Sequence, residues 1–145
     1  MPTIDIQVQR FSVVSQQPFD EVMRRLTATI GELEAVVRDS VGSSDLMEFV
    51  RFDSGDVLRK GRGGQGPRML RLVVGNPLIM KEMAKAVPDA ASYAPVTILI
   101  DERPDGVHMS YDSMASLLAP YGRQDALGIA TDLDTKVEEL LQAAA

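Results

Sequence analysis

Apolar residues recur at helical spacing in two long segments of the chain. After Pro18 they fall at offsets 0, 3, 4, 7, 11 and 14: Phe19, Val22, Met23, Leu26, Ile30 and Leu33. Near the end of the chain they fall at offsets 0, 3, 4, 7, 11, 14 and 15: Ala126, Ile129, Ala130, Leu133, Val137, Leu140 and Leu141. Such spacing gives a helix one apolar face. We therefore expect a helix after Pro18, which Gly31 can end early, and a C-terminal helix about 30 Å long.

Alternating apolar and polar residues predict strands elsewhere. Residues 3–15 alternate, and their phase changes at Arg10, which a β-bulge near Phe11 would explain. Pro104-Asp105-Gly106 has the chemistry of a tight turn between two strands. Four further segments have the composition of strands: residues 47–53, 69–75, 96–101 and 107–112. For residues 47–53 a helix that begins at Asp45 is the alternative.

The order of these elements indicates the fold class. Strands mostly follow strands, so we expect an α+β domain whose sheet is mainly antiparallel, with the N-terminal and C-terminal helices packed on one face. A short helix over residues 113–119 should begin at an Asp112 cap and stop at Pro120. Residues 34–46 give no clear pattern. The chain has 145 residues, no internal repeat and no linker, which predicts one domain over residues 1–145.

Composition removes several kinds of chemistry. The chain has no cysteine, which excludes disulfides, thiolate metal sites and cysteine nucleophiles, and its single histidine excludes a two-histidine centre within one chain. A net charge of −6 disfavours binding to nucleic acid or to an anionic membrane. No apolar run approaches the ~18–20 residues of a membrane span, and the N-terminus lacks a signal-peptide pattern. We therefore expect a cytoplasmic protein with no metal and no cofactor. Asp132 and Asp134 should lie on the polar face of the C-terminal helix.

The glycine-rich segment of residues 61–67 imitates a nucleotide-binding motif. Gly61, Gly63 and Gly66 have the spacing G-x-G-x-x-G, but a dinucleotide fingerprint must open a helix, and here Pro67 and a strand follow. We interpret the segment as a flexible loop. Five cationic residues lie within thirteen residues around it: Arg59, Lys60, Arg62, Arg68 and Arg71. They form either a solvated face or a patch that binds phosphate or carboxylate groups.

Gly75-Asn76-Pro77 is the most informative tripeptide for a site. Asn76 is a favourable N-cap and Pro77 a favourable first helical residue. A helix that starts directly after a strand points free N–H donors beyond the sheet, which suits an anion, although helix capping alone also explains the tripeptide. We predict that a small carboxylate- or phosphate-bearing ligand binds at this helix start. The candidate ligand-binding residues are Asn76, Pro77, Met80, Met83, Tyr93 and Tyr111.

Several of these residues carry a resemblance to a known family. The chain resembles the uncharacterised bacterial and archaeal family called domain of unknown function 302, from about residue 9 to residue 119, in Gly75-Asn76-Pro77, Met83, Tyr93-x-Pro95, Asp105-Gly106 and Tyr111-Asp112. The resemblance implies an open antiparallel sheet of about five strands under a long helix, similar to the TATA-binding-protein arrangement, and a homodimer. It implies no activity. Arg51-Phe52-Asp53 resembles a family strand that ends in Asp-His, but Ser54 replaces the histidine, so a metal or haem role does not carry over.

Three function classes remain open at this stage. The first is a dimeric module that binds a small apolar or anionic molecule in a groove of the sheet. The second is an enzyme of unknown class that uses Asp53, Tyr93, Tyr111 or Asp112 as acid or base. The third is a protein-interaction domain that uses only its dimer surface. Because the commonest nucleophiles and metal ligands are missing, we favour the binding module.

Overall fold

The strand-like segments form one curved, open sheet in a computed structural model that describes residues 5–32 and 42–145. Five strands pair antiparallel, and a two-residue strand pairs in parallel with one edge. The spatial order is β1-β6-β5-β4-β3-β2. The strands are β1 (Arg10–Ser15), β2 (Gly31–Glu32), β3 (Met47–Phe52), β4 (Met69–Gly75), β5 (Val96–Arg103) and β6 (Gly106–Asp112). The predicted mainly antiparallel α+β fold is confirmed.

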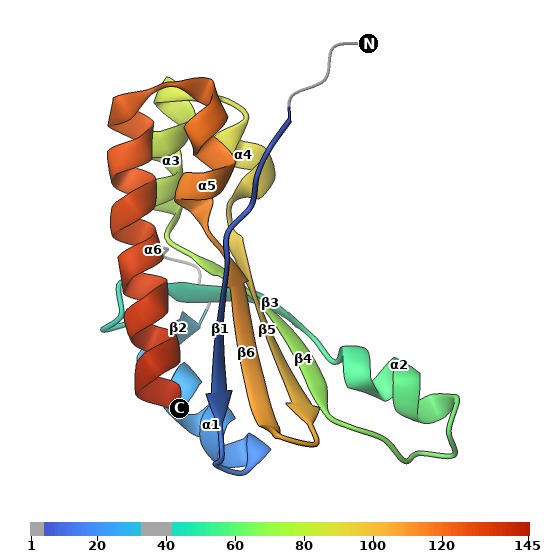
Figure 1. Cartoon of the computed structure of the whole chain (residues 1–145). Coiled ribbons are helices and arrows are strands. Elements are labelled where there is room, and N and C mark those ends of the chain that lie inside the picture. The colour runs from blue at the N-terminus through green and yellow to red at the C-terminus, as the bar shows by residue number, and fades with distance from the viewer. Residues whose placement is uncertain (1–4, 33–41) are drawn as a thin grey trace.

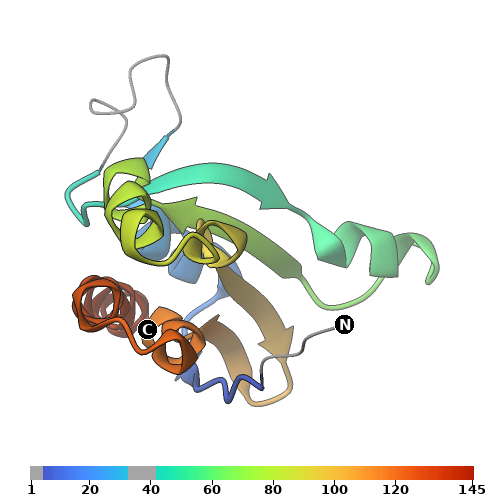
Figure 2. The same ribbon diagram turned by 90° about the horizontal axis from the view of Figure 1, so that it is seen from above.

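The helices lie mostly over one face of this sheet (Figures 1 and 2). The long helix α6 packs against α1, α3 and α5 and runs along the sheet. The helices are α1 (Phe19–Thr27), α2 (Ser54–Lys60), α3 (Pro77–Ala86), α4 (Ala90–Tyr93), α5 (Met114–Leu118) and α6 (Gln124–Ala144), with a 3₁₀ turn at Ala119–Tyr121. In the described part of the chain, no helix is both long and apolar enough to cross a membrane.

The hydrophobic core lies between the sheet and α6, because strand alternation sends every second side chain inward. On β5, Ile98 and Ile100 are buried, and on β6, Met109 and Tyr111 are buried. The apolar face of α6 meets them with Leu133, Val137 and Leu141. The other face of the sheet carries side chains of the opposite parity.

The structure corrects the sequence-based boundaries near the N-terminus. Strand β1 begins at Arg10, and residues 5–9 form no strand, so no bulge is needed; residues 3–4 lie outside the described part. Helix α1 ends at Thr27 instead of continuing to Leu33, which also lies outside the described residues. Ile30 is buried as its apolar spacing suggested, but it leads into β2 rather than extending the helix.

The cap of α5 is also not the predicted residue. The Ser113 hydroxyl, not Asp112, accepts the hydrogen bond from the backbone N–H of Ser116, at 3.1 Å. Asp112 instead points to the other face of the sheet and binds Arg10. Pro120 ends the α-helix as expected, because the chain continues as a 3₁₀ turn.

Helix α2 was not predicted, and it changes the meaning of the basic segment. It begins at an Asp53 cap and projects from the body beyond β3 (Figures 1 and 2). Three of the five clustered cations meet carboxylates: Arg59 with Asp53 at 3.2 Å, Lys60 with Asp56 at 2.8 Å, and Arg68 with Asp20 at 2.5 Å. The segment is therefore not a uniform positive patch. The glycine-rich loop is followed directly by β4, so it opens no helix.

Candidate ligand site between the ends of β5 and β6

One end of the β5–β6 pair borders an open hollow. Paired residues run from Arg103 opposite Gly106 to Ile98 opposite Tyr111. Beyond that end, β5 is entered from α4 and β6 continues into α5 (Figure 1). An open hollow of about 380 Å³ lies here, lined by Arg10, Arg71, Tyr93, Val96, Thr97, Leu99, Ser110, Tyr111, Asp112 and Leu117.

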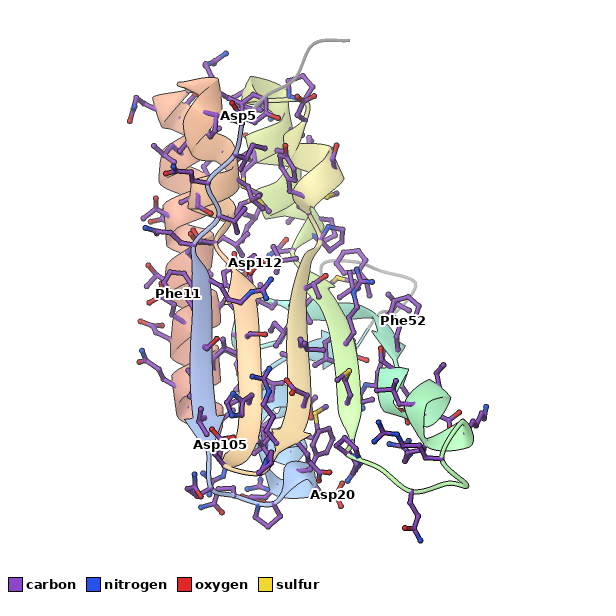
Figure 3. All side chains as sticks on the ribbon, turned by 45° about the vertical axis from the view of Figure 1, so that its right-hand side comes forward. Asp5, Phe11, Asp20, Phe52, Asp105 and Asp112 are labelled. Atoms are coloured by element: carbon purple, nitrogen blue, oxygen red, sulfur yellow. The ribbon has the colours of Figure 1, made fainter. Side chains whose placement is uncertain are left out.

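Strand register explains why several of these residues share one face. Arg71 lies opposite Leu99, and Leu99 lies opposite Ser110. Directly opposite residues of antiparallel strands point to the same side of a sheet, here the side that faces away from α6. Figure 3 looks onto this side, with Asp112 near the end of β6 and Phe52 on β3. The hollow therefore opens on the sheet face that the helices leave uncovered.

Arg71 is held at the hollow by weak neutral contacts. Its guanidinium lies 5.6 Å from the centre of the Phe52 ring and donates a long hydrogen bond of 3.4 Å to the Thr97 hydroxyl. Across residues 5–32 and 42–145, no carboxylate forms an ion pair with it. Arg71 therefore brings a positive charge to the rim that the described chain does not neutralise.

Arg10 and Asp112 form the opposite part of the rim. They lie opposite each other in β1 and β6, and the Arg10 guanidinium donates two hydrogen bonds to the carboxylate, at 2.5 and 2.8 Å. These bonds lower the pKa of Asp112 below its ordinary value and raise the pKa of Arg10. Both groups are charged at neutral pH, and their charges cancel.

The hydroxyl groups of the two tyrosines at the hollow form hydrogen bonds within the chain. The buried Tyr111 hydroxyl donates to the Asp134 carboxylate at 2.6 Å. Burial, followed by the negative charge of Asp134, raises the pKa of Tyr111 well above its ordinary value. The Tyr93 hydroxyl shares a hydrogen bond of 2.8 Å with the Tyr121 hydroxyl, and this bond raises the pKa of Tyr121. The Tyr111 ring is 1% exposed and belongs to the core, so the half-buried Tyr93 is the tyrosine that presents ring surface to the hollow.

The structure divides the six predicted site residues between two places. Tyr93 and Tyr111 both line the hollow of about 380 Å³, and not the start of α3, where they were expected from the sequence. The other four line a separate apolar cavity of about 10 Å³, which is the space of a single water: Asn76, Pro77, Met80 and Met83. Asn76 caps α3 as expected, since its side-chain oxygen accepts from the Leu78 N–H at 2.9 Å. Its amide group donates to Asp45, so its polar groups are used within the chain.

Sequence reasoning missed the cations of the hollow. Arg71 was grouped with the cations around the glycine-rich loop, as a solvated face or an anion-binding patch, and Arg10 was used only to mark where a strand pattern changes phase. The available signal was the alternation of β4, which places Arg71 on the face opposite Leu70 and Leu72. Among the residues that the structure describes, no group of three histidine, aspartate or glutamate side chains could hold a metal ion.

Comparisons with known proteins agree with this architecture. The model of the DUF302 family, a domain of unknown function, matches residues 11–144. The chain belongs to the DUF302 family. The match includes α6, so the long helix is part of the DUF302 domain and extends the resemblance beyond residue 119. No curated protein matches the chain.

A solved structure shows that the fold also occurs in a distant DUF302 protein. The chain is similar to the crystal structure of an uncharacterised conserved DUF302 protein from Bacillus stearothermophilus, with a TM-score of 0.73. The similarity covers 94% of this chain and 98% of the other, at 12% sequence identity. At that identity the likeness concerns the DUF302 fold and not a shared ligand or activity.

Proposed function

We propose that this DUF302 protein binds a small organic molecule in the hollow at the ends of β5 and β6. The observation that carries the proposal is the composition of a hollow of about 380 Å³. The partly exposed side chains of Tyr93, Leu99 and Leu117 form its apolar part, and Thr97 and Ser110 add hydroxyl groups on the sheet. Small-molecule sites typically have this size and combine apolar walls with a few polar groups.

A binding role is favoured over catalysis because the candidate acids and bases are occupied. Tyr111 donates to Asp134, and Asp112 is held by two hydrogen bonds from Arg10. Asp53 caps α2 and pairs with Arg59, outside the hollow. A general acid or base needs a free proton position beside the substrate, and none of these groups offers one.

Filling the hollow tests this proposal. We expect small-molecule fragments to perturb backbone amide NMR signals around residues 93–99 and 110–117 of the wild-type protein. Leu99→Trp should remove those perturbations, because the larger side chain occupies the hollow. Leu78→Trp is the matched control, since Leu78 is half-exposed on α3 and lies outside the hollow. Unchanged fragment binding by Leu99→Trp would contradict the proposal.

We also propose that the protein is a homodimer that associates through an apolar patch at β3 and α2. The patch consists of four apolar side chains that are between 40% and 72% exposed: Val50, Phe52, Val57 and Leu58. These side chains come from two elements that follow each other in the chain, and exposed apolar groups favour an interaction surface; a two-fold interface joins the same surface of both copies. The charges of α2 are paired internally, through Asp53–Arg59 and Asp56–Lys60, so two copies can approach here without strong repulsion despite their net charge.

Light scattering at micromolar concentration tests the dimer. We expect twice the monomer mass of 15.8 kDa for the wild-type protein. Replacing both Val57 and Leu58 with Asp should give the monomer, because four carboxylates would meet in the dimer interface. Leu78→Asp adds a charge at an equally exposed leucine on α3 and should remain dimeric. A monomeric wild type, or a dimer that survives the double substitution, would contradict this assignment.

A further inference from the structure

We infer that the ligand of this hollow is a small monocarboxylate with an apolar body, whose acid group binds Arg71. The inference rests on the proposed function and adds the charge and the orientation of the ligand. The apolar body would lie toward α4 and α5, against Tyr93, Leu99 and Leu117.

Arg71 differs from the guanidinium groups around it. Arg10, Arg68 and Arg103 each bind a carboxylate of the chain, namely Asp112, Asp20 and Asp101. Among the described residues, Arg71 contacts the Phe52 ring and makes the long bond to Thr97, and these contacts orient it without neutralising it. A planar guanidinium can donate two parallel hydrogen bonds to a carboxylate, so Arg71 is a receptor of matching geometry.

The charged side chains that line the hollow favour a ligand with one negative charge. Two guanidiniums, Arg10 and Arg71, and one carboxylate, Asp112, give a net charge of +1 (2 − 1) in a chain whose net charge is −6. A monoanion is the charge that balances this site. A dianionic phosphate would need a second cation to balance its second negative charge. Arg10 does not supply that charge, because its guanidinium is already paired with the Asp112 carboxylate. A cationic ligand would be repelled by the positive charge of Arg71.

The positions of the lining residues set the direction of the ligand. Arg71 comes from β4, next to β5, while Tyr93 and Leu117 come from α4 and α5 beyond the strand ends. Leu99 and Ser110 continue the cross-strand row of Arg71 and extend the floor of the site across the sheet. A carboxylate at Arg71 therefore directs an attached apolar chain over Leu99 and into the space between the two short helices.

Paired probes separate the effect of charge from the effect of shape. The probes are 3-phenylpropanoate and octanoate, each compared with its own primary amide, titrated at pH 7 and followed by amide NMR signals. We expect wild-type protein to bind each acid at least tenfold more tightly than its amide. Arg71→Gln should weaken acid binding about 10- to 100-fold, as for loss of a charge-assisted hydrogen bond, and leave amide binding unchanged. Arg71→Lys should fall between the two, because it keeps the charge but loses the planar fork.

Arg62→Gln is the matched control for net charge. Arg62 is exposed in the loop outside the hollow and forms no ion pair with the described residues, so its loss should leave acid binding unchanged. Equal weakening by Arg62→Gln and Arg71→Gln would overturn the inference. Equal binding of acids and amides, both removed by Leu99→Trp, would overturn it while the proposed function stands. Absence of any perturbation at the hollow, with every variant folded by circular dichroism, would overturn both.

Discussion

Asp134→Ala is expected to lower the free energy of unfolding by about 3 kcal/mol or more, because several buried donors lose their acceptor together. Asp134 is only 5% exposed on α6. Its carboxylate accepts from the Tyr111 hydroxyl at 2.6 Å and from the Ser113 hydroxyl at 2.5 Å. It also accepts from the first N–H groups of α5, those of Met114 at 2.8 Å and Ala115 at 3.1 Å. One side chain thus joins α6 to the end of β6 and to the start of α5.

Urea denaturation followed by circular dichroism measures this effect. Asp134→Asn should be destabilising by a smaller amount, since the amide keeps one oxygen but turns an N–H group toward a donor. Asp132→Ala provides the matched control, because Asp132 is exposed two residues earlier on the same helix; its effect should stay within about 0.5 kcal/mol. A loss below about 1 kcal/mol for Asp134→Ala would show that these donors find other partners.

Leu133→Ala is expected to cost about 2–5 kcal/mol, through lost burial and the cavity left behind. Leu133 is 3% exposed and lies on the inner face of α6. It already borders the small apolar cavity beside Met83 and Phe49, so the removed volume would enlarge an existing void. Thermal or urea unfolding measures the change. Leu78→Ala is the control, because Leu78 is half-exposed on α3; it should change the free energy of unfolding by about 0.5 kcal/mol or less. An equally small effect of Leu133→Ala would contradict the packing of α6 on the sheet.

The sequence predicted those elements whose boundaries depend on local chemistry. Strand β4 and the start of α3 were placed correctly, because an Asn-Pro cap directly follows an apolar run. The turn at Pro104 and Asp105 likewise fixed the β5–β6 hairpin. Residues 5–9 alternate like a strand but form none, since β6 ends at Asp112; the Gln9 carbonyl still accepts a hydrogen bond from the Ser113 N–H at 2.8 Å, where the chain turns into α5. Helix α2 has too few apolar positions to show helical periodicity, and it depends on the Asp53 cap.

The candidate site could be predicted only in part because it depends on pairing between distant strands. Tyr93 and Tyr111 were expected beside Asn76 at the start of α3, but they line a different hollow. Arg71 and Arg10 reach the hollow through the register of β4, β5, β6 and β1, which residue spacing within one segment cannot determine. Asp134 was expected on a polar helix face, but α5 and the end of β6 cover it with donors. Its burial follows from tertiary packing alone.

The position of β1 at the edge of the sheet has a consequence for how the chain folds. Its register places Phe11 opposite Tyr111, so about 100 residues separate the two strands. The β5–β6 hairpin closes through a short local turn, whereas β1 must wait for a long loop to close, at a greater cost in chain entropy. Until β1 arrives, the backbone edge of β6 is open to strands of other chains. Newly synthesised copies are therefore most exposed to aggregation before their first strand docks.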